Sequence, residues 1–564
     1  MGRIQILGIS GLLLYTLLAT SFWSNLGRDF QNDGLEYNER RIKYAFNQLP
    51  VDQIAQRLDE TLPRTTAVSF GPSVARSDFL MQRLTEALYP RVVLAQDAQV
   101  VDLATLASSQ ATKSPVKLDF SLFGFLVSLI SALGFGAMTL LVLRRPIAIE
   151  FLPGTLIVAG SVIIGLLATI ATWFQIAFSS MLVLWTGVVF AAAALAIAWR
   201  RRLLRKPLPP KVETYIFIGL LLLFLVRMVE FPVTLWDGRS VWLFAAKKLY
   251  FNGMMTKFDL THSAFQFSNP SYPLLMPAWL GHFTSWNGTG LYNERMATLG
   301  YPVFFAALLS LWWVALRQTL GRWLGAATTL ALFFMFENMT SGGYTDQLVA
   351  LAIGFALYSF RKQDTAFIGW LALIAASLMK AEGLVFGLLT ALFYIFFQKP
   401  KSTSRLASVL PLLCFLPAFI HRLWTRSVGV KDIFQDSNHS LGDMFSRVGE
   451  LFGLLPTLFE VEGYTATRFV SRAGFVAFVL GCAVLLWLIK QNRNSLNYTH
   501  RLGSISLGLC IVSFAVCCLV VAAVPFDVNW FFGVTVDRLL LMPSLFAISS
   551  LLLLTAQDRK HNNQ

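Results

Sequence analysis

One carboxylate in this chain stands where acid/base chemistry is plausible. Asp237 follows the apolar run 215–229 within the sequence LWDGRSVW, residues 235–242. A carboxylate this close to the end of a membrane span loses hydration and gains few partners, so it is rarely placed there for solubility. Trp236 and Trp242 suit the headgroup layer. Two interpretations follow: an aromatic-belted helix end, or an acid/base group at a membrane surface.

Two more polar clusters interrupt apolar runs further along the chain. Asp346, in the sequence GGYTDQ, begins one run, where a helix N-terminus favours an anion. A plain capping role is the alternative. Lys380 and Glu382 lie between two other runs, where ionisable groups are usually functional or paired. A mutual ion pair is the alternative, although residues two apart do not face each other on a regular helix. Gly383 suggests a local break.

Cations and a histidine complete the set of candidate residues. Arg422 and Arg538 stand at the edges of apolar runs, where either one could simply bind lipid headgroups. Together with the carboxylates, they fit a site for a phosphate-bearing lipid, since guanidinium forks match phosphate oxygens. His262 lies close to the turn at residues 269–273 and could orient an acceptor. A solvated loop histidine is an equal interpretation.

The elements that position these residues are predicted to cross a membrane. The chain has 564 residues, of which 55% are hydrophobic and 14% charged, whereas soluble proteins carry about 25% charged and 45–50% apolar residues. The formal charge is 46 − 31 = +15. Much of this excess lies in short loops between apolar runs, where it sets topology, so nucleic-acid binding is the weaker interpretation.

The apolar runs predict an all-α polytopic membrane protein with about fourteen spans of about 20 residues each. Basic residues in seven short loops place these loops, and both termini, on the cytoplasmic side. The predicted divisions are a first span at 1–23, a small α/β domain at 24–117, spans at 118–230, a loop with the acidic motif at 231–295, and a bundle at 296–564 whose outer loop is 421–468.

Two of the loop regions have predictable local structure. In the 24–117 segment, residues 66–70 and 91–94 are candidate strands, while residues 54–62 and 79–88 have helical spacing. We expect this domain to be structural or regulatory. In the 231–295 segment, residues 242–250 mix aromatic side chains with two lysines, as a helix lying on a membrane would.

These motifs, in this order, resemble those of the GT-C glycosyltransferases, polytopic enzymes that use polyprenyl-phosphate sugars. The likeness is to the branch with protein mannosyltransferases and the lipid A aminoarabinose transferase, and it covers roughly residues 213–556. Many members carry a second acidic residue where this chain has Gly238. A single-carboxylate base is therefore more natural, and neither a metal nor another cofactor is indicated. The motifs that carry the resemblance are WDGR at 236–239, YP at 272–273, YTD at 344–346, KAEG at 380–383 and DR at 537–538.

The resemblance implies transfer of a sugar from a polyprenyl phosphate to an acceptor hydroxyl, with inversion, on the extracytoplasmic face. Asp237 would be the general base, with Asp346 also in the catalytic set. The implied partners are the lipid-linked donor, membrane lipids and a glycan, lipid or protein acceptor. The phosphate-binding candidates are Lys380, Arg422 and Arg538; the candidates for binding or orienting the acceptor are Arg239, His262, Tyr272, Tyr344 and Glu382.

Two other functions stay open from the sequence. An O-antigen-ligase-like transferase would use a diphosphate lipid donor, with Arg and His dominating its outer loop, and His421 and Arg422 are compatible with it. A lipid or solute transporter would use intramembrane charges as a substrate path, often with internal repeats. We find no repeat between the halves. The short tails favour a bacterial inner membrane.

Overall fold

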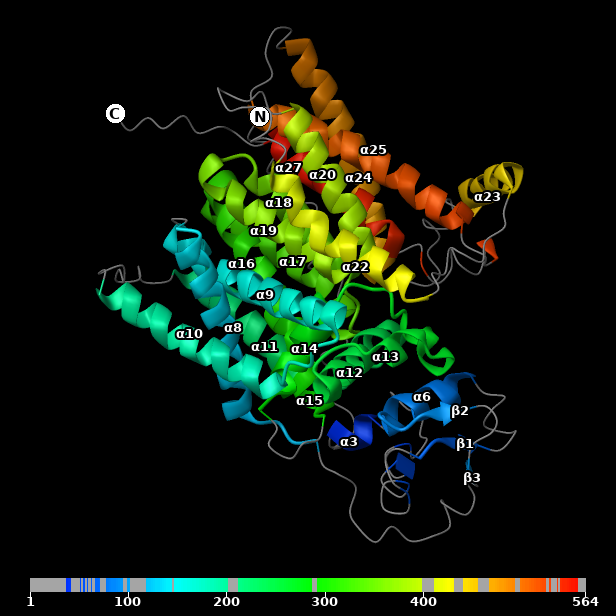
Figure 1. The fold of residues 1–564 in the computed structure, drawn as a ribbon. Coiled ribbons are helices and arrows are strands. Elements are labelled where there is room, and N and C mark those ends of the chain that lie inside the picture. Colours follow the sequence, from blue (N-terminus) through cyan, green and yellow to red (C-terminus); the bar gives the residue numbers. More distant parts are fainter. Residues whose placement is uncertain are drawn as a thin grey trace.

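Helices dominate the computed structural model of this protein (Figure 1). The structure describes residues 37–41, parts of 51–101, 118–144, 147–200, 211–286, 292–397, 410–430, 440–454, 466–491, 498–523, 527–528, 535 and 538–555. The predicted first span at 1–23 and both chain termini lie outside these residues. The chain is therefore a helical membrane protein in the part that the structure describes.

Six helical segments among the described residues are long and apolar enough to cross a membrane. They correspond to α8 (Leu122–Val142), η2 with α9 (Ile149–Phe151 and Leu152–Phe174), α10 (Ser180–Arg200), α11 (Val212–Glu230), α15 with α16 (Glu294–Ala297 and Gly300–Leu320) and α25 (Tyr498–Ala523).

The other helices of the bundle vary in length. The apolar stretches within α18, α19, α20, α24 and α27 are each shorter than 18 residues. α27 packs against α24, α25 and α18, so the end of the chain joins the middle of the bundle. The bounds are α17 (Arg322–Ser341), α18 (Asp346–Ser359), α19 (Gln363–Met379), α20 (Ala381–Phe397), α23 (Leu441–Leu454), α24 (Ala466–Gln491) and α27 (Leu541–Thr555).

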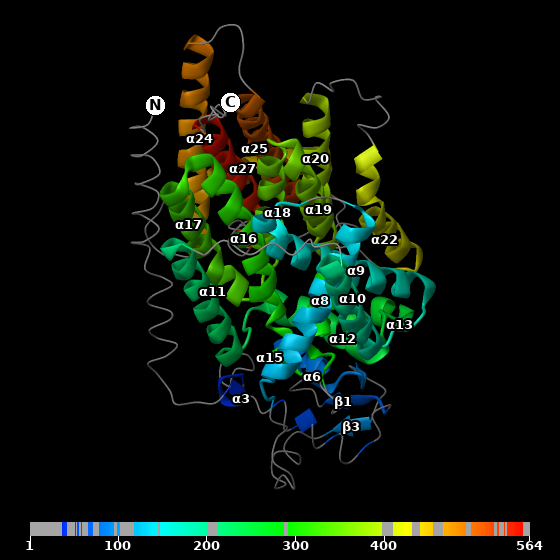
Figure 2. The same ribbon diagram turned by 90° about the vertical axis from the view of Figure 1, so that its left-hand side faces the viewer.

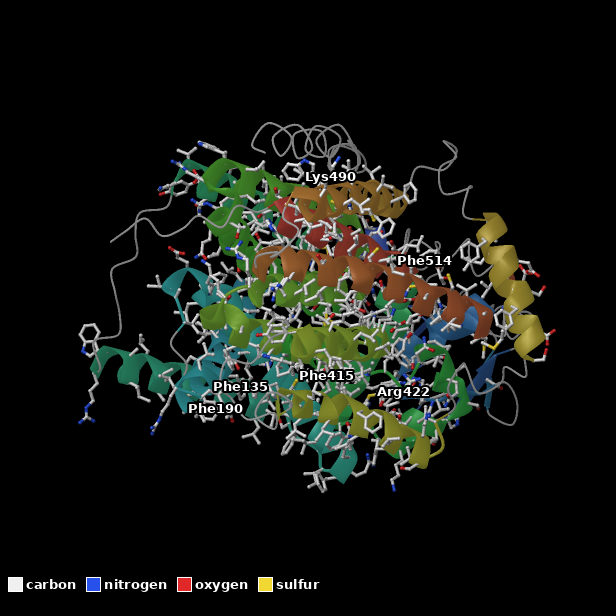
Figure 3. All side chains as sticks on the ribbon, turned by 90° about the horizontal axis from the view of Figure 1, so that it is seen from above. Phe135, Phe190, Phe415, Arg422, Lys490 and Phe514 are labelled. Atoms are coloured by element: carbon white, nitrogen blue, oxygen red, sulfur yellow. The ribbon has the colours of Figure 1, made fainter. Side chains whose placement is uncertain are left out.

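The apolar run before His421 and Arg422, predicted to be one membrane span, has a different structure in its described part. Instead of one long apolar helix, the chain forms η5 (Leu410–Phe415) and the amphipathic α22 (Leu416–Ser427). α22 buries His421 and Thr425 and exposes leucine and phenylalanine side chains on its other face. Arg422, expected just after a span, therefore lies within α22, on the flank of the bundle (Figure 3).

Three short parallel strands lie at one end of the molecule, which we call the strand end (Figures 1 and 2). β1 (Val68–Phe70) is central between β2 (Val93–Leu94) and β3 (Gln99–Val101). The connection from β1 to β2 contains the helix α6 (Asp78–Leu88). Both predicted strands and the helix between them are present, and β3 is an additional strand that was not predicted. We call the described residues between 37 and 101, with the helix α3 (Tyr37–Arg40), the strand segment.

The 231–295 segment lies between the strands and the bundle (Figure 1). It begins with η3 (Asp237–Leu243), a π-helix, which is rare and often marks a functional site. α12 (Phe244–Asn252), α13 (Lys257–Thr261), the short η4 (Ser263–Ser268) and α14 (Leu275–Thr284) follow.

The expected membrane-surface helix at 242–250 is not what the structure has. α12 packs against α14, and Trp242 and Lys248 are fully buried in the protein. Lys247 donates to the backbone carbonyls of Glu86 and Ala87 in the strand segment. Both lysines therefore contact protein: Lys247 binds the strand segment, and Lys248 is buried within the 231–295 segment.

Burial of Lys248 predicts a pH-dependent stability. Its ammonium lies over the rings of Phe244 and Phe265 at 4.3 and 4.5 Å and donates to Ser268 at 3.2 Å. Burial lowers the pKa of this amine to about 7. Between pH 7 and about 10 the unfolded chain holds a proton that the folded chain lacks, so this group makes stability rise with pH.

Lys248→Met should therefore raise the melting temperature most at pH 6–7, and the gain should shrink towards pH 9.5. The measurement is thermal unfolding in detergent across this range. Lys257→Met, at an exposed position on α13, is the matched control and should show no such trend. A gain for Lys248→Met that does not change with pH would contradict the prediction.

Candidate functional site

The ends of several helices bring four charged residues together. Asp237 begins the π-helix, Asp346 is the first residue of α18, Lys380 separates α19 from α20, and Arg538 precedes α27. These positions span about 300 residues of sequence, yet each side chain contacts the next. Four of the sequence-predicted residues thus form one cluster, which we call the charge relay.

Carboxylates and cations alternate along the charge relay. The Nη2 atom of Arg538 donates to Asp237 Oδ2 and lies 3.2 Å from Asp346 Oδ2. The other Asp346 oxygen accepts from Lys380 Nζ at 2.6 Å, and Lys380 lies 3.4 Å from Glu382 Oε1. Each cation thus lies between two carboxylates. Burying an ion costs several kcal/mol in lost hydration, and the opposite charges on either side of each cation offset part of this cost.

Lys380 reaches two acids because the helix breaks at this residue. Its backbone is extended, with φ −153° and ψ 154°, so it separates α19 from α20. The predicted break at Gly383 is therefore displaced to Lys380. Gly383 instead allows close packing: a Cβ there would lie 1.9 Å from the carbonyl oxygen of Ala376 on α19. Lys380 does form the ion pair with Glu382, at 3.4 Å, but its contact with Asp346 is shorter, at 2.6 Å.

Two glycines allow close packing of the backbone segments that carry Asp237 and Asp346. A Cβ on Gly238 would lie 2.7 Å from the carbonyl oxygen of Gly342 and 2.9 Å from the Cα of Gly343. The π-helix therefore packs its backbone directly on the turn before α18. Gly343 has φ +84°, a conformation that favours glycine. A packing constraint thus accounts for glycine at position 238.

Aromatic side chains surround the charge relay. Tyr272 stacks on Trp242 with ring centroids 5.4 Å apart, and Lys380 lies 5.8 Å from its ring centroid. Tyr344 carries the guanidinium of Arg538 over its ring at 4.5 Å. The phenol of Tyr301 is fully buried near Asp237. Tyr272 and Tyr344 were predicted site residues, whereas Tyr301 had no signal in the sequence because it lies inside an apolar run.

Three buried donors beside the charge relay have no hydrogen-bond partner among the residues that the structure describes. They are Tyr301 Oη, Trp242 Nε1 and Arg538 Nε. Buried polar groups are rarely left without a partner in folded proteins. A hydroxylated or anionic ligand would supply acceptors for them. No group of three or more His, Cys, Asp or Glu residues that could hold a metal occurs within the described ranges.

Two predicted residues lie away from the charge relay. Arg239 is buried and points to Glu294, donating to both of its carboxylate oxygens. His262 caps η4 through Nδ1 and packs on Phe258 and Phe265. The structure thus gives Arg239 an internal ion pair and His262 a local structural contact. Both are candidates from the sequence because Arg239 lies two residues after Asp237 and His262 lies close to the turn at 269–273.

His421, rather than Arg422, connects α22 to the site. It is buried, its Nδ1 accepts from Trp173, and its Nε2 lies 3.3 Å from the carbonyl oxygen of Tyr272. Because Nδ1 accepts, Nε2 carries the proton and donates to that carbonyl. His421 thereby holds the turn that carries Tyr272. Arg422 is the neighbouring residue on the same helix (Figure 3).

Comparison with known proteins finds no matching family model, no similar curated protein and no similar solved structure. The function is therefore inferred from the residues and geometry of the charge relay.

The Gly238 contact predicts a steric effect. Gly238→Ala should lower the free energy of unfolding by about 1–3 kcal/mol, because the added methyl group meets backbone atoms that cannot give way. Gly219→Ala is the matched control, since a Cβ there has nothing within 4 Å. Thermal unfolding in detergent measures both. Equal melting temperatures for the two variants would show that the backbones are not packed this closely.

Proposed function

We propose that this protein is a membrane glycosyltransferase of GT-C type. It moves a sugar from a polyprenyl-phosphate donor to an acceptor hydroxyl, and the charge relay is its active site. The finer features of this proposal are about fourteen spans, an α/β domain in the strand segment, and a strand end that faces the extracytoplasmic side of a bacterial inner membrane. The acceptor is a glycan, a lipid or a protein.

The charge relay itself carries the proposal. Carboxylates and cations from four separated parts of the chain meet at the ends of helices, where the headgroup of a membrane-bound lipid would lie. A structural ion pair needs only two partners, whereas here Arg538 and Lys380 each contact two carboxylates. A buried salt bridge is weak evidence for stability, so such a cluster favours a functional interpretation.

Asp237 is the general base in this mechanism. Its carboxylate accepts the proton of the acceptor hydroxyl while the acceptor oxygen forms a bond to the anomeric carbon. The bond between that carbon and the donor phosphate breaks at the same time, and polyprenyl phosphate leaves with the electron pair. Attack from the face opposite the leaving group inverts the anomeric configuration. Proton transfer of this kind contributes about 10²–10⁴ in rate.

The two cations bind the phosphate that leaves. Arginine has five N–H donors in a planar fork, and the Nε of Arg538 has no partner in the described structure. Lysine has three donors, and Lys380 uses one of them in its hydrogen bond to Asp346, while Glu382 is an ion-pair contact at 3.4 Å. Both cations can therefore contact a phosphate without releasing their carboxylates. Asp346 orients the two cations, and fixed charges of this sort stabilise the growing negative charge on the leaving group.

The remaining candidates keep secondary roles in this proposal. Tyr272, Tyr344 and Glu382 lie close enough to the charge relay to orient the sugar or the acceptor. Arg422 lies on α22 next to His421 and would meet the donor phosphate only from that flank. The proposed reaction uses no cofactor.

Asp237→Asn should strongly reduce transfer, because a carboxamide keeps the shape of the side chain but cannot take a proton. We expect a fall of about 10²–10⁴ in kcat with normal amounts of folded protein. The assay incubates purified protein in lipid vesicles with radiolabelled prenyl-phosphate sugars and an extract of acceptor lipids and glycans, and measures the released prenyl phosphate. Asp119→Asn, an exposed acid just before α8, is the matched control. Near-normal turnover of Asp237→Asn would overturn the proposed base.

Lys380→Ala and Arg538→Ala test the phosphate site separately. Each variant should raise the KM for the lipid donor about tenfold or more, because a charge-assisted hydrogen bond contributes about 1.5–3 kcal/mol. Arg538→Lys should retain part of the affinity but not all, since an ammonium cannot form the guanidinium fork. Donor kinetics that are unchanged in both alanine variants would count against the phosphate site.

A further inference from the structure

A second buried charge cluster joins the strand segment to the helix that carries Asp237. Glu86 on α6 accepts from Arg83 Nη1 on both carboxylate oxygens, at 2.9 and 2.8 Å. The same carboxylate accepts from the hydroxyl of Ser240 at 2.6 Å, and Arg83 also donates to Ser240 at 3.2 Å. Ser240 lies in the π-helix, one turn after Asp237. All three side chains are buried.

Arg239 extends this cluster to the bundle. Its Nε lies 4.0 Å from Glu86, and its other nitrogens donate to Glu294 on α15. Arg41, from the strand segment, contacts the same Glu294 carboxylate at 3.1 Å. Arg239 also donates to the carbonyl oxygen of Val233, before the π-helix. The π-helix is thus held from the strand segment on one side and from α15 on the other.

A tyrosine provides a second attachment of the strand segment. Tyr89 follows α6 and places its ring against Phe244, Phe251 and Phe265, with centroids 5.7, 6.2 and 5.8 Å away. Its hydroxyl donates to Asp259 at 2.8 Å. Aromatic contacts of this kind fix α6 against α12, so Glu86 meets the π-helix in a defined position.

The cluster is poorly explained by stability alone. Replacing buried ion pairs with apolar side chains is often neutral or stabilising, whereas charge pairs fix geometry because each partner must face the other. The element that these charges hold is the π-helix. Its Gly238 packs on Gly343, three residues before Asp346. A shift of this helix would move Asp237 away from Arg538.

We propose that the strand segment is a positioning element for the active site: Glu86, held by Arg83, fixes Ser240 and Arg239 and thereby aims the carboxylate of Asp237. Glu86 and Ser240 are positioning residues, since neither contacts the charge relay. This inference rests on the proposed role of Asp237. Misplacement of a reacting group by about 1 Å can cost about 10²-fold in rate.

The test uses the full chain in lipid vesicles with the prenyl-phosphate assay. Glu86→Gln and Ser240→Ala should each lower kcat about 10- to 100-fold with little change in the KM for the donor, because neither side chain contacts Lys380 or Arg538. The double variant should be no worse than the less active single variant, since both changes weaken the same contact between Glu86 and Ser240. Glu39→Gln, an exposed acid in the strand segment, is the matched control and should turn over normally.

Hydrogen exchange gives a readout that does not depend on activity. The backbone amides of residues 238–243 should exchange faster in Glu86→Gln and Ser240→Ala than in the native protein, with the melting temperature little changed in Ser240→Ala. A kcat per folded molecule equal to that of the native protein, together with unchanged exchange, would overturn the positioning role. If Glu86→Gln does not fold, Ser240→Ala decides the question alone.

The same experiment separates the two proposals. If Asp237→Asn retains turnover, the proposed function fails, yet the exchange of residues 238–243 still shows whether Glu86 holds the π-helix. If Asp237→Asn is inactive while Glu86→Gln and Ser240→Ala turn over normally, only the positioning role fails.

Discussion

The contact of one guanidinium with two carboxylates is the constraint on which this site depends. Arg538 lies between Asp237 and Asp346, so each charge offsets part of the cost of burying the others. The desolvation of each ion costs several kcal/mol, which the neighbouring opposite charges offset only at close range. The ends of the π-helix, α18 and α27 must therefore meet within hydrogen-bonding distance, and this requirement ties the last part of the bundle to its middle.

Close backbone packing makes that meeting possible. Gly238 and Gly343 allow the π-helix to lie directly on the turn before α18, and Gly383 brings α20 against α19 near Lys380. Small residues let helices approach closely in membranes, where apolar side chains gain little by leaving lipid. Glycine packing and charge pairing thus act together, since the ions meet only where the backbones can approach.

The strand segment adds a second layer of support from outside the bundle. Its charge cluster at Glu86 and its aromatic contacts at Tyr89 both end on the 231–295 segment. This segment therefore packs between two protein layers instead of lying on a lipid surface. The burial of α12 and its lysines follows from the same arrangement. A preorganised site needs side chains whose own positions are held by their neighbours.

Hydrophobic runs and residue types by themselves determined that this is a helical membrane protein, because about 20 apolar residues are needed to cross a bilayer. They also suggested Asp237, Asp346, Lys380, Arg538, Tyr272 and Tyr344 as candidate site residues, since charges and aromatic side chains beside apolar runs are recognisable without a structure. Only the tertiary structure decided which of them meet. Arg239 and His262 stand close to site residues in sequence but turn to Glu294 and to η4. Glu86, Ser240 and Tyr301 gave no local signal, because their positions follow from packing between segments far apart in the chain.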